Sequence, residues 1–211
     1  MSFKRTAVGL VSRFVPTMHI RSVTRIAHDI EIQRYFRRLA PGIVLDVGAK
    51  RSPYRKHIPA TRFMTLDSDS ALKPDLCCDI HAIEWQDDYF DTMIATQVLE
   101  HVREPQWAVD EIRRILKPKG VCIASVPFIY PYHPDPADYY RYTQDSLKHL
   151  FRDFSLVEVT HYGGRVQSVW QLINRGTVIT GPFLNLLNPL LARIRFKRTY
   201  VPSGFIVFAV K

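Results

Sequence analysis

Three acidic residues stand at or near the ends of short apolar stretches, in an order that suits the binding of a nucleoside. Asp46 comes first, Asp67 follows 21 residues later, and Asp79 directly precedes the apolar Ile80. An acid about 20 residues beyond the first turn is placed to accept hydrogen bonds from both hydroxyls of a ribose. Asp79 and Ile80 suit the amino group and the ring face of adenine. Together these residues predict a nucleoside pocket.

The loop after Asp46 decides which kind of nucleotide the pocket favours. Gly48 lets the backbone turn tightly and approach a ligand closely. A nicotinamide dinucleotide needs a glycine-rich turn, ideally GxGxxG, that places a pyrophosphate on a helix N-terminus. Here Gly48 is followed by Ala-Lys-Arg-Ser-Pro, with no further glycine. The loop therefore counts against NAD and favours a cofactor without phosphates.

Residues 130–142 form a second chemical group, with five tyrosines, three prolines, two aspartates, a histidine and an arginine. Prolines stiffen such a loop, and its aromatic and charged side chains line a pocket. His133 is the expected base for an oxygen acceptor. Asp138 is expected to orient His133 or share its task, and Arg141 to bind an anionic substrate. The other substrate-binding candidates are Tyr132, Tyr139 and Tyr140. The alternative is a tyrosine-rich lid whose charged residues pair with one another.

Strand-like and helix-like stretches alternate along the chain and must position these groups. Apolar runs predict strands at residues 43–47, 62–66, 76–78, 90–95, 121–126, 155–160 and 205–210. Helical patterns cover residues 28–39, 107–116 and 144–151, the last capped by Thr143, and Trp107, Ile112 and Ile115 are expected in the core. This alternation predicts an α/β fold with a mainly parallel sheet. Ligands of such sheets bind beyond the carboxyl ends of the strands, where the acids and Gln97 follow.

Four stretches in this order resemble the successive motifs of class I S-adenosylmethionine-dependent methyltransferases, in the broad subgroup with an EHV segment. They are VLDVGAKRSPY, FMTLDSDS, DLCCDIHAIEWQDDYFDTMIATQVLEHV and EIRRILKPKGVCIASVPF, and the resemblance covers about residues 30–160. The later PFIYPYHPDPADYYRYTQDSLKHLF is similar to a substrate-side segment of bacterial members, many of them in glycan, lipid or natural-product pathways.

The resemblance implies a Rossmann-like sheet of seven strands, with helices on both faces and S-adenosylmethionine as cofactor. It places Asp67 at the ribose and Gln97 beside the reacting methyl group. The remaining cofactor-binding positions are Asp46 and Gly48 at the methionine end, and Asp79 and Ile80 at the adenine. The chain departs from the family at Lys50, where a second glycine is usual. Lys50 or Arg51 is then expected to pair with the methionine carboxylate.

The resemblance also implies methyl transfer, in which the enzyme chiefly positions the acceptor. We expect O-methylation of a small, sugar-linked or lipid-linked acceptor. The alternative is a degenerate protein of this fold that acts as a membrane-peripheral binding module, and a nucleic-acid methyltransferase is a weaker option. Glu100 and His101 are expected to cap a helix or hold a loop, and the sequence predicts no metal site. The three cysteines have no metal-ligand spacing and fit a reduced compartment.

Charge is divided unevenly along the chain, whose net charge is +9. Residues 1–42 carry eight Lys and Arg against two acids, and residues 159–211 carry seven against none. We expect a basic extension over residues 1–27 and a methyltransferase domain over 28–211, with an apolar and basic insertion at 168–200. Such ends suit an anionic membrane surface, and no stretch predicts a transmembrane helix. The expected location is cytoplasmic, with peripheral membrane contact or organelle import as alternatives.

Overall fold

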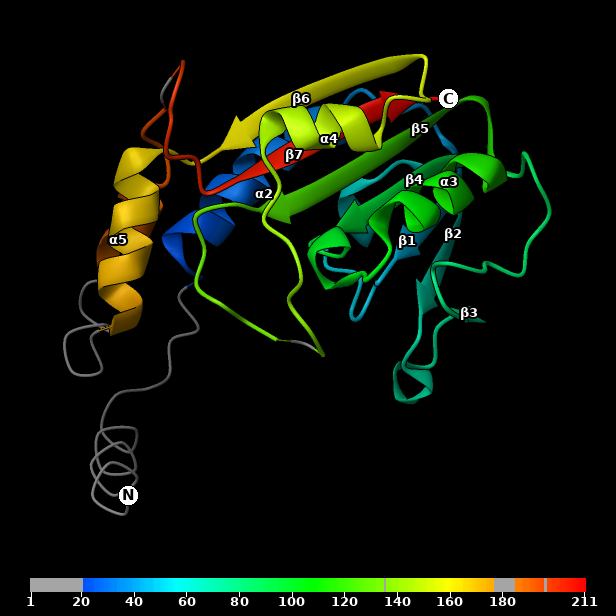
Figure 1. Cartoon of the computed structure of the whole chain (residues 1–211), viewed down its shortest axis with the longest axis horizontal. Helices are drawn as coiled ribbons and strands as arrows, with labels where there is room; N and C mark the ends of the chain where they lie inside the picture. The colour runs from blue at the N-terminus through cyan, green and yellow to red at the C-terminus, as the bar shows by residue number, and fades with distance from the viewer. Residues whose placement is uncertain (1–20, 135, 177–184, 196) are drawn as a thin grey trace.

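A seven-stranded sheet runs through the centre of the molecule (Figure 1). The computed structural model describes residues 21–134, 136–176, 185–195 and 197–211. The strands are β1 (Gly42–Val47), β2 (Ala60–Asp67), β3 (Leu76–Cys77), β4 (Phe90–Thr96), β5 (Leu116–Pro127), β6 (Leu156–Tyr162) and β7 (Gly204–Val210). Their order is β3-β2-β1-β4-β5-β7-β6, and only β7 runs antiparallel to its neighbours. The predicted mainly parallel α/β sheet of seven strands is confirmed.

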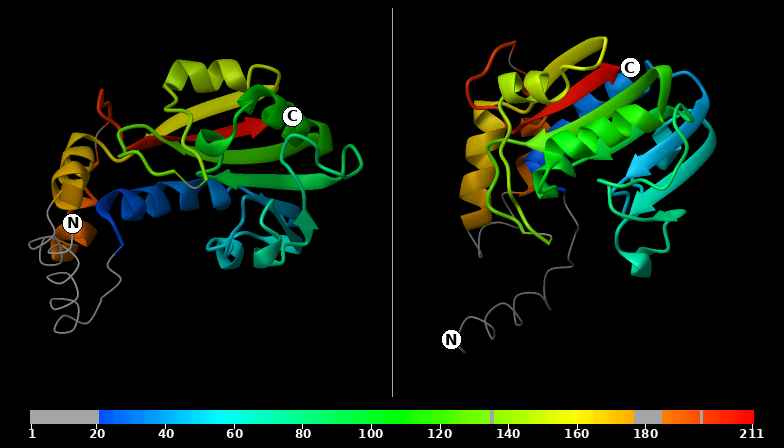
Figure 2. Two further views of the ribbon diagram at one scale, coloured as in Figure 1. Left: turned by 60° about the horizontal axis from the view of Figure 1, so that its bottom comes forward. Right: turned by 45° about the vertical axis from the view of Figure 1, so that its right-hand side comes forward.

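Helices cover both faces because neighbouring residues of each central strand point to opposite sides (Figure 2). Val44 of β1 packs in the cluster formed with α2 (Val23–Phe36), whereas Leu45 packs in the larger cluster on the other face. That second face is covered by α3 (Pro105–Ile115) and α4 (Gln144–Leu150). The helical cover on both faces, predicted from the resemblance, is therefore confirmed.

The helices agree with the sequence patterns in part. Thr143 caps α4 as predicted, because its side chain accepts a hydrogen bond from the Ser146 N–H at 3.1 Å. Helix α2 begins at Val23 rather than at residue 28, because Ser22 caps it by accepting from the Arg25 N–H. Trp107 was expected in the core and is 60% exposed. It precedes the buried Ala108, which places it about 100° further around the helix, away from the sheet.

The chain between β6 and β7 forms a separate helical corner at one end of the sheet (Figure 1, left). It contains α5 (Arg165–Gly176), the short turn η4 (Asn185–Leu187) and α7 (Asn188–Leu191). Most of this corner lies within the expected insertion at 168–200, although α5 begins at Arg165, and most of the expected extension at 1–27 falls outside the described residues. Among the residues described, no helix is both long enough and apolar enough to cross a bilayer.

Candidate functional site

The loop after β1 turns sharply at the carboxyl edge of the sheet. Gly48 has a φ of +60°, and a Cβ there would lie 2.7 Å from Cγ2 of Val98. A larger residue at this position therefore meets both backbone strain and a clash. Lys50 also has a positive φ, of 44°. The backbone thus turns in the same left-handed way where the resembled family has a second glycine, and the departure at Lys50 does not straighten the loop.

The carboxylate of Asp67 ties this loop to the end of β2. Its Oδ2 accepts a hydrogen bond from the Lys50 N–H at 3.1 Å, and its Oδ1 accepts from the Asp69 N–H at 3.1 Å. A carboxylate has about four lone-pair positions, so two remain for a ligand. Asp46, near the end of β1, is only 2% exposed. Burial, with a contribution from nearby Asp67, raises the pKa of Asp46 to about 7.

A groove of about 600 Å³ runs from these residues towards β3. Asp67 and Asp79 line it together with the buried, apolar Ile80. The Asp79 side chain is 68% exposed and pairs with Nδ1 of His81 at 2.6 Å. A hydrogen bond from the His81 backbone N–H is the main cause that lowers the pKa of Asp79. The groove therefore presents carboxylates and one apolar wall, as a nucleoside requires.

A second cavity, of about 290 Å³, adjoins the groove. Four residues line both spaces, namely Gly48, Lys50, Gln97 and His101. Gln97 has a φ of 56°, and its side-chain amide donates to Ser125 Oγ at 3.2 Å. His133 lines the second cavity but not the groove. The structure thus brings six of the seven predicted cofactor residues around one groove, leaves the buried Asp46 outside its lining, and places His133 in the adjoining space.

The Asp138 carboxylate is bonded to neighbouring groups of its own loop. Its carboxylate pairs with both terminal nitrogens of Arg141 and accepts from the His133 backbone N–H at 3.0 Å. The hydrogen bonds from Arg141 are the main cause that lowers the pKa of Asp138 to about 2. Such a carboxylate is a poor base and a good support for the loop. Arg141 also donates to two backbone carbonyls, so its guanidinium faces the protein's own acceptors.

The three tyrosines predicted to bind substrate lie in different places. Tyr139 lines the groove. Tyr140 donates its hydroxyl to the Arg103 carbonyl at 2.9 Å and lines neither of the two spaces. Tyr132 is 73% exposed and also lies outside both. Of the three, only Tyr139 borders the expected ligand site.

A buried network around His28 was missed by sequence analysis. The His28 ring bonds to Ser125 Oγ at 2.9 Å and to the Tyr54 hydroxyl at 3.0 Å, and Tyr54 donates to Asp29 at 2.6 Å. Burial is the main cause that lowers the pKa of His28. The ring lines the second cavity beside Tyr162. The available signal was a polar residue on an apolar helix face. The helix was predicted to begin only at residue 28, so His28 stood at its end rather than within that face.

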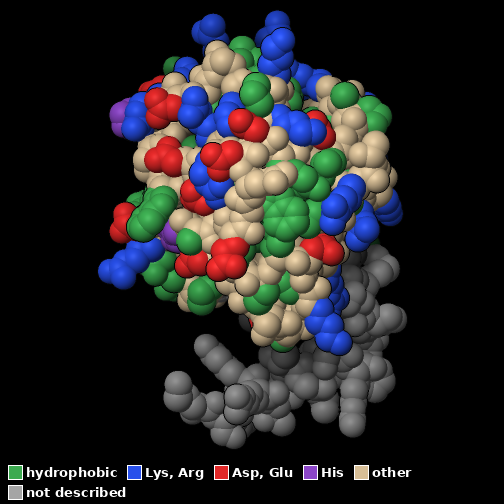
Figure 3. Space-filling model, turned by 90° about the vertical axis from the view of Figure 1, so that its right-hand side faces the viewer, with side chains coloured by type: hydrophobic (Ala, Val, Ile, Leu, Met, Phe, Trp, Pro, Cys, Tyr) green, Lys and Arg blue, Asp and Glu red, His purple; other side chains and the backbone are tan. Residues whose placement is uncertain are grey.

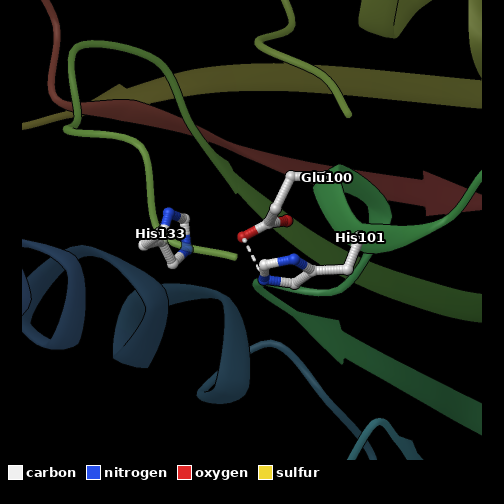
Figure 4. A group of neighbouring side chains, drawn as sticks. All are labelled: Glu100, His101 and His133. Carbon is white, nitrogen blue, oxygen red and sulfur yellow. Dashed lines mark ion pairs between the residues drawn. The ribbon is translucent and has the colours of Figure 1, made fainter. Parts of the chain in front are cut away.

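Glu100, His101 and His133 lie together at the junction of the two spaces (Figure 4). Glu100 and His101 belong to the turn η3 (Leu99–His101) after β4, and His133 comes from the loop after β5. One ligand atom from each side chain lies within 4.8 Å of the others. Glu100 is fully buried, which raises its pKa to about 8. The sequence predicted a structural role for the first two residues and did not connect them with His133.

Comparison with known proteins supports the fold. No curated protein matches the sequence. A methyltransferase from Archaeoglobus fulgidus, described as SAM-dependent, is 15% identical with a TM-score of 0.57, over 86% of this chain and 94% of that one. A possible histamine N-methyltransferase from Thermotoga maritima is 13% identical with a TM-score of 0.59, over 90% and 91%. Phosphoethanolamine N-methyltransferase 2 from Haemonchus contortus, bound to S-adenosylmethionine, is 14% identical with a TM-score of 0.57, over 87% and 52%.

The chain also matches a family by sequence. Residues 57–124 match the family described as "Methyltransferase domain". This segment runs from the loop before β2 into β5 and contains most of the residues that line the groove. Residues 57–124 thus match a methyltransferase domain, and the described part of the chain has the fold of the S-adenosylmethionine-dependent methyltransferases to which it is similar.

Proposed function

We propose that the protein transfers a methyl group from S-adenosylmethionine to a hydroxyl oxygen of a small, sugar-linked or lipid-linked acceptor. One observation carries the proposal: the nucleoside groove and the cavity of His133 meet at Gln97 and His101. A cofactor with its adenine end at Ile80 and its methionine end at Gly48 brings its reactive centre to this junction. Holding two reactants in a productive geometry can lower a barrier by about 7–11 kcal/mol.

The residues of the groove fit this cofactor chemically. Asp67 keeps acceptor positions for two ribose hydroxyls, and Ile80 offers an apolar surface to the adenine ring. Asp79 serves the adenine amino group, and Asp46 supports the loop from behind. The Lys50 side chain borders both spaces, where an ammonium group pairs with the methionine carboxylate. The cofactor supplies an electrophilic methyl group at its sulfonium.

The acceptor side offers polar groups suited to an oxygen nucleophile. A hydroxyl must lose its proton as it attacks, and the imidazole of His133 borders the cavity next to the junction. Asp138 holds the His133 backbone and acts as a positioning residue. Tyr139 contributes the wall next to the groove. Proton removal is therefore assigned to His133.

The test uses S-adenosylmethionine with a trideuterated methyl group and an extract of small molecules and lipids from a bacterial culture. We expect a product with the mass increment of that group, with fragmentation that places it on oxygen. Asp67→Asn should strongly reduce the amount of product at a low cofactor concentration, and Asp88→Asn, which changes an exposed acid away from the groove, should not. Labelled nitrogen would contradict the oxygen assignment. Binding of S-adenosylhomocysteine without any labelled product would favour the degenerate binding module.

We further propose that the helical corner contacts an anionic lipid surface. Apolar side chains exposed on this corner are Val169, Leu172, Ile173, Leu186, Leu187, Leu190 and Ile194. Arg193 and Arg195 lie at its end, and the sequence has no acid after residue 158. The opposite end of the molecule instead mixes acidic and basic side chains (Figure 3). Apolar groups beside basic groups suit the interface of an anionic bilayer.

Sedimentation with vesicles of phosphatidylcholine and phosphatidylglycerol tests this contact. Each buried leucine contributes about 1.5–3 kcal/mol, so Leu187→Ser with Leu190→Ser should weaken binding about tenfold or more. Leu156→Ser is the matched control, because Leu156 is exposed on β6 outside the corner. Equal binding by both variants would show that the corner does not meet the bilayer.

A further inference from the structure

The cluster of Glu100, His101 and His133 contains a buried carboxyl group that accepts no hydrogen bond from the described residues. Glu100 has no exposed surface, and neither of its carboxylate oxygens has a hydrogen-bond partner among the described residues. The closest cationic candidate is His101, whose Nε2 lies 3.8 Å from Oε1. An unpaired carboxylate in such a place is costly unless a cation or a proton accompanies it. Arg141 lies nearby, but its guanidinium is bound to Asp138.

The His101 ring is oriented as a metal ligand would be. Its Nδ1 hydrogen-bonds to the Ala137 carbonyl, which can only accept, so the proton must reside on Nδ1. A neutral ring then presents the lone pair of Nε2 towards Glu100. Histidines that bind metals are commonly fixed in this way, through a hydrogen bond from the other ring nitrogen to a backbone carbonyl.

His133 completes the group from a distant part of the chain. Its ring packs edge-on against His101 with 5.1 Å between centroids and against Tyr130 with 5.0 Å. Its Nδ1 has no hydrogen-bond partner among the described residues, although Asp138 Oδ2 is 3.3 Å away. Figure 4 shows the Glu100 carboxylate between the two imidazole rings. Two imidazoles and one carboxylate thus converge on one small volume.

We propose that Glu100, His101 and His133 bind one divalent transition-metal cation, of which Zn²⁺ is the reference. Two histidines and one carboxylate leave open positions on such an ion, as in catalytic zinc sites. Ligand atoms around Zn²⁺ lie about 3.5 Å apart at bond lengths of about 2.0–2.2 Å, so atoms that now lie within 4.8 Å of one another approach by at most about 1.3 Å on binding.

The proposed role of the cation rests on the proposed methyl transfer. The cluster borders the junction of the groove and the second cavity, where the acceptor would meet the cofactor. An acceptor hydroxyl that occupies an open position on the cation has a lowered pKa and releases its proton to water. The oxygen then attacks the sulfonium methyl carbon. An oxygen–carbon bond forms, the carbon–sulfur bond breaks with its electron pair on sulfur, and the products are the methyl ether, S-adenosylhomocysteine and a proton. His133 serves as a ligand in this scheme, and the cation replaces it as the agent of proton removal.

The test titrates Co²⁺ and then Zn²⁺ into the full chain after treatment with EDTA and desalting. We expect one Co²⁺ per chain, seen as a visible absorption band that one equivalent of Zn²⁺ removes. Glu100→Gln and His133→Gln should each weaken Zn²⁺ binding by about 100-fold or more, because each removes a direct ligand. His149→Gln, which changes an exposed histidine on α4, should leave it unchanged. Glu100→Gln keeps the size and shape of the buried side chain, which favours a folded variant.

Two results would overturn the metal site: no absorption band, or a band that persists in both ligand variants and so arises elsewhere. Calorimetry with S-adenosylhomocysteine separates this outcome from failure of the proposed function. The metal-free protein and Glu100→Gln should bind it within about threefold of the Zn²⁺-loaded protein, because neither lacks a cofactor residue. Cofactor binding without metal binding overturns the metal site alone. Metal binding without cofactor binding overturns the proposed methyl transfer.

Discussion

The two halves of the site are built in opposite ways. In the cofactor half, the Asp67 carboxylate is already bonded to the backbone N–H groups of Lys50 and Asp69, so the loop is fixed before a ligand arrives. In the acceptor half, the Glu100 carboxylate is buried deeper and has no hydrogen-bond partner among the described residues. A half that is preorganised needs only its ligand. The unpartnered carboxyl group of the other half needs a proton or a cation, and a bound cation is the arrangement that we propose.

The largest expected effect comes from the turn that shapes the cofactor half. Gly48→Ala places a Cβ 2.7 Å from Val98 at a φ of +60°. Strain of about 1–2 kcal/mol and the clash should together weaken S-adenosylhomocysteine binding by about 100-fold or more, measured by calorimetry. Gly163→Ala is the matched control, since Gly163 has a φ of +62° and lies outside both spaces. It should lower the melting temperature and leave the affinity of the folded protein intact. Equal affinity in both variants would contradict a preorganised first loop.

Asp67→Asn is expected to have the next largest effect on cofactor binding. The amide keeps the shape of the side chain but removes the charge and two of its acceptor positions, so hydrogen bonds to the ribose and to the loop weaken together. We expect the dissociation constant for S-adenosylhomocysteine to rise by about 30-fold. Asp88→Asn should not change it. An unchanged dissociation constant in Asp67→Asn would show that this residue does not bind the ribose.

Lys50→Gln removes the ammonium group and so tests the contribution of the side chain apart from that of the loop backbone. Loss of a charge-assisted hydrogen bond to the methionine carboxylate should weaken binding by about tenfold. Lys73→Gln is the control, because Lys73 also has a positive φ, of 51°, and does not line the groove. If the two variants bind alike, the lysine contributes only its backbone, and the departure from glycine is neutral.

The smallest effect concerns the buried network behind the acceptor half. Burial lowers the pKa of His28, whereas the unfolded chain protonates this residue at about 6.5. The unfolded state therefore binds more protons, and stability is lost as the pH falls below that value. Arg25 and Asp29 act on the ring in opposite directions, and Tyr54 and Tyr162 pack against it. His28→Gln should flatten the fall in unfolding free energy between about pH 7.5 and 5.5, measured with urea. His57→Gln, at an exposed position, should keep the wild-type slope.

The grouping of the proposed cofactor residues around one groove was predictable because their signals lie within short contiguous stretches. A buried strand followed by Asp67 or by Gly48 is a local pattern, and strand periodicity fixed their edge of the sheet. The seven strands were predicted for the same reason. Helix boundaries were less accurate, since the cap at Ser22 lies outside the apolar pattern of α2.

The acceptor half could not be predicted in the same way. Glu100 and His133 are brought together by the loops after β4 and β5, and their mutual distance depends on how these strands pair. The contact between His28 and Ser125 likewise joins α2 to β5. The composition of residues 130–142 indicated a ligand-facing loop, but it did not distinguish His133 from the exposed Tyr132. Such contacts become visible only in three dimensions.

A crystal structure of the protein with S-adenosylhomocysteine tests the central claim most directly. The account predicts ribose hydroxyls at Asp67, adenine against Ile80, and the sulfur at the junction beside Gln97, facing His101 and His133. A ligand elsewhere, or a sulfur directed away from this junction, would contradict the joining of cofactor and acceptor halves on which the proposed methyl transfer depends.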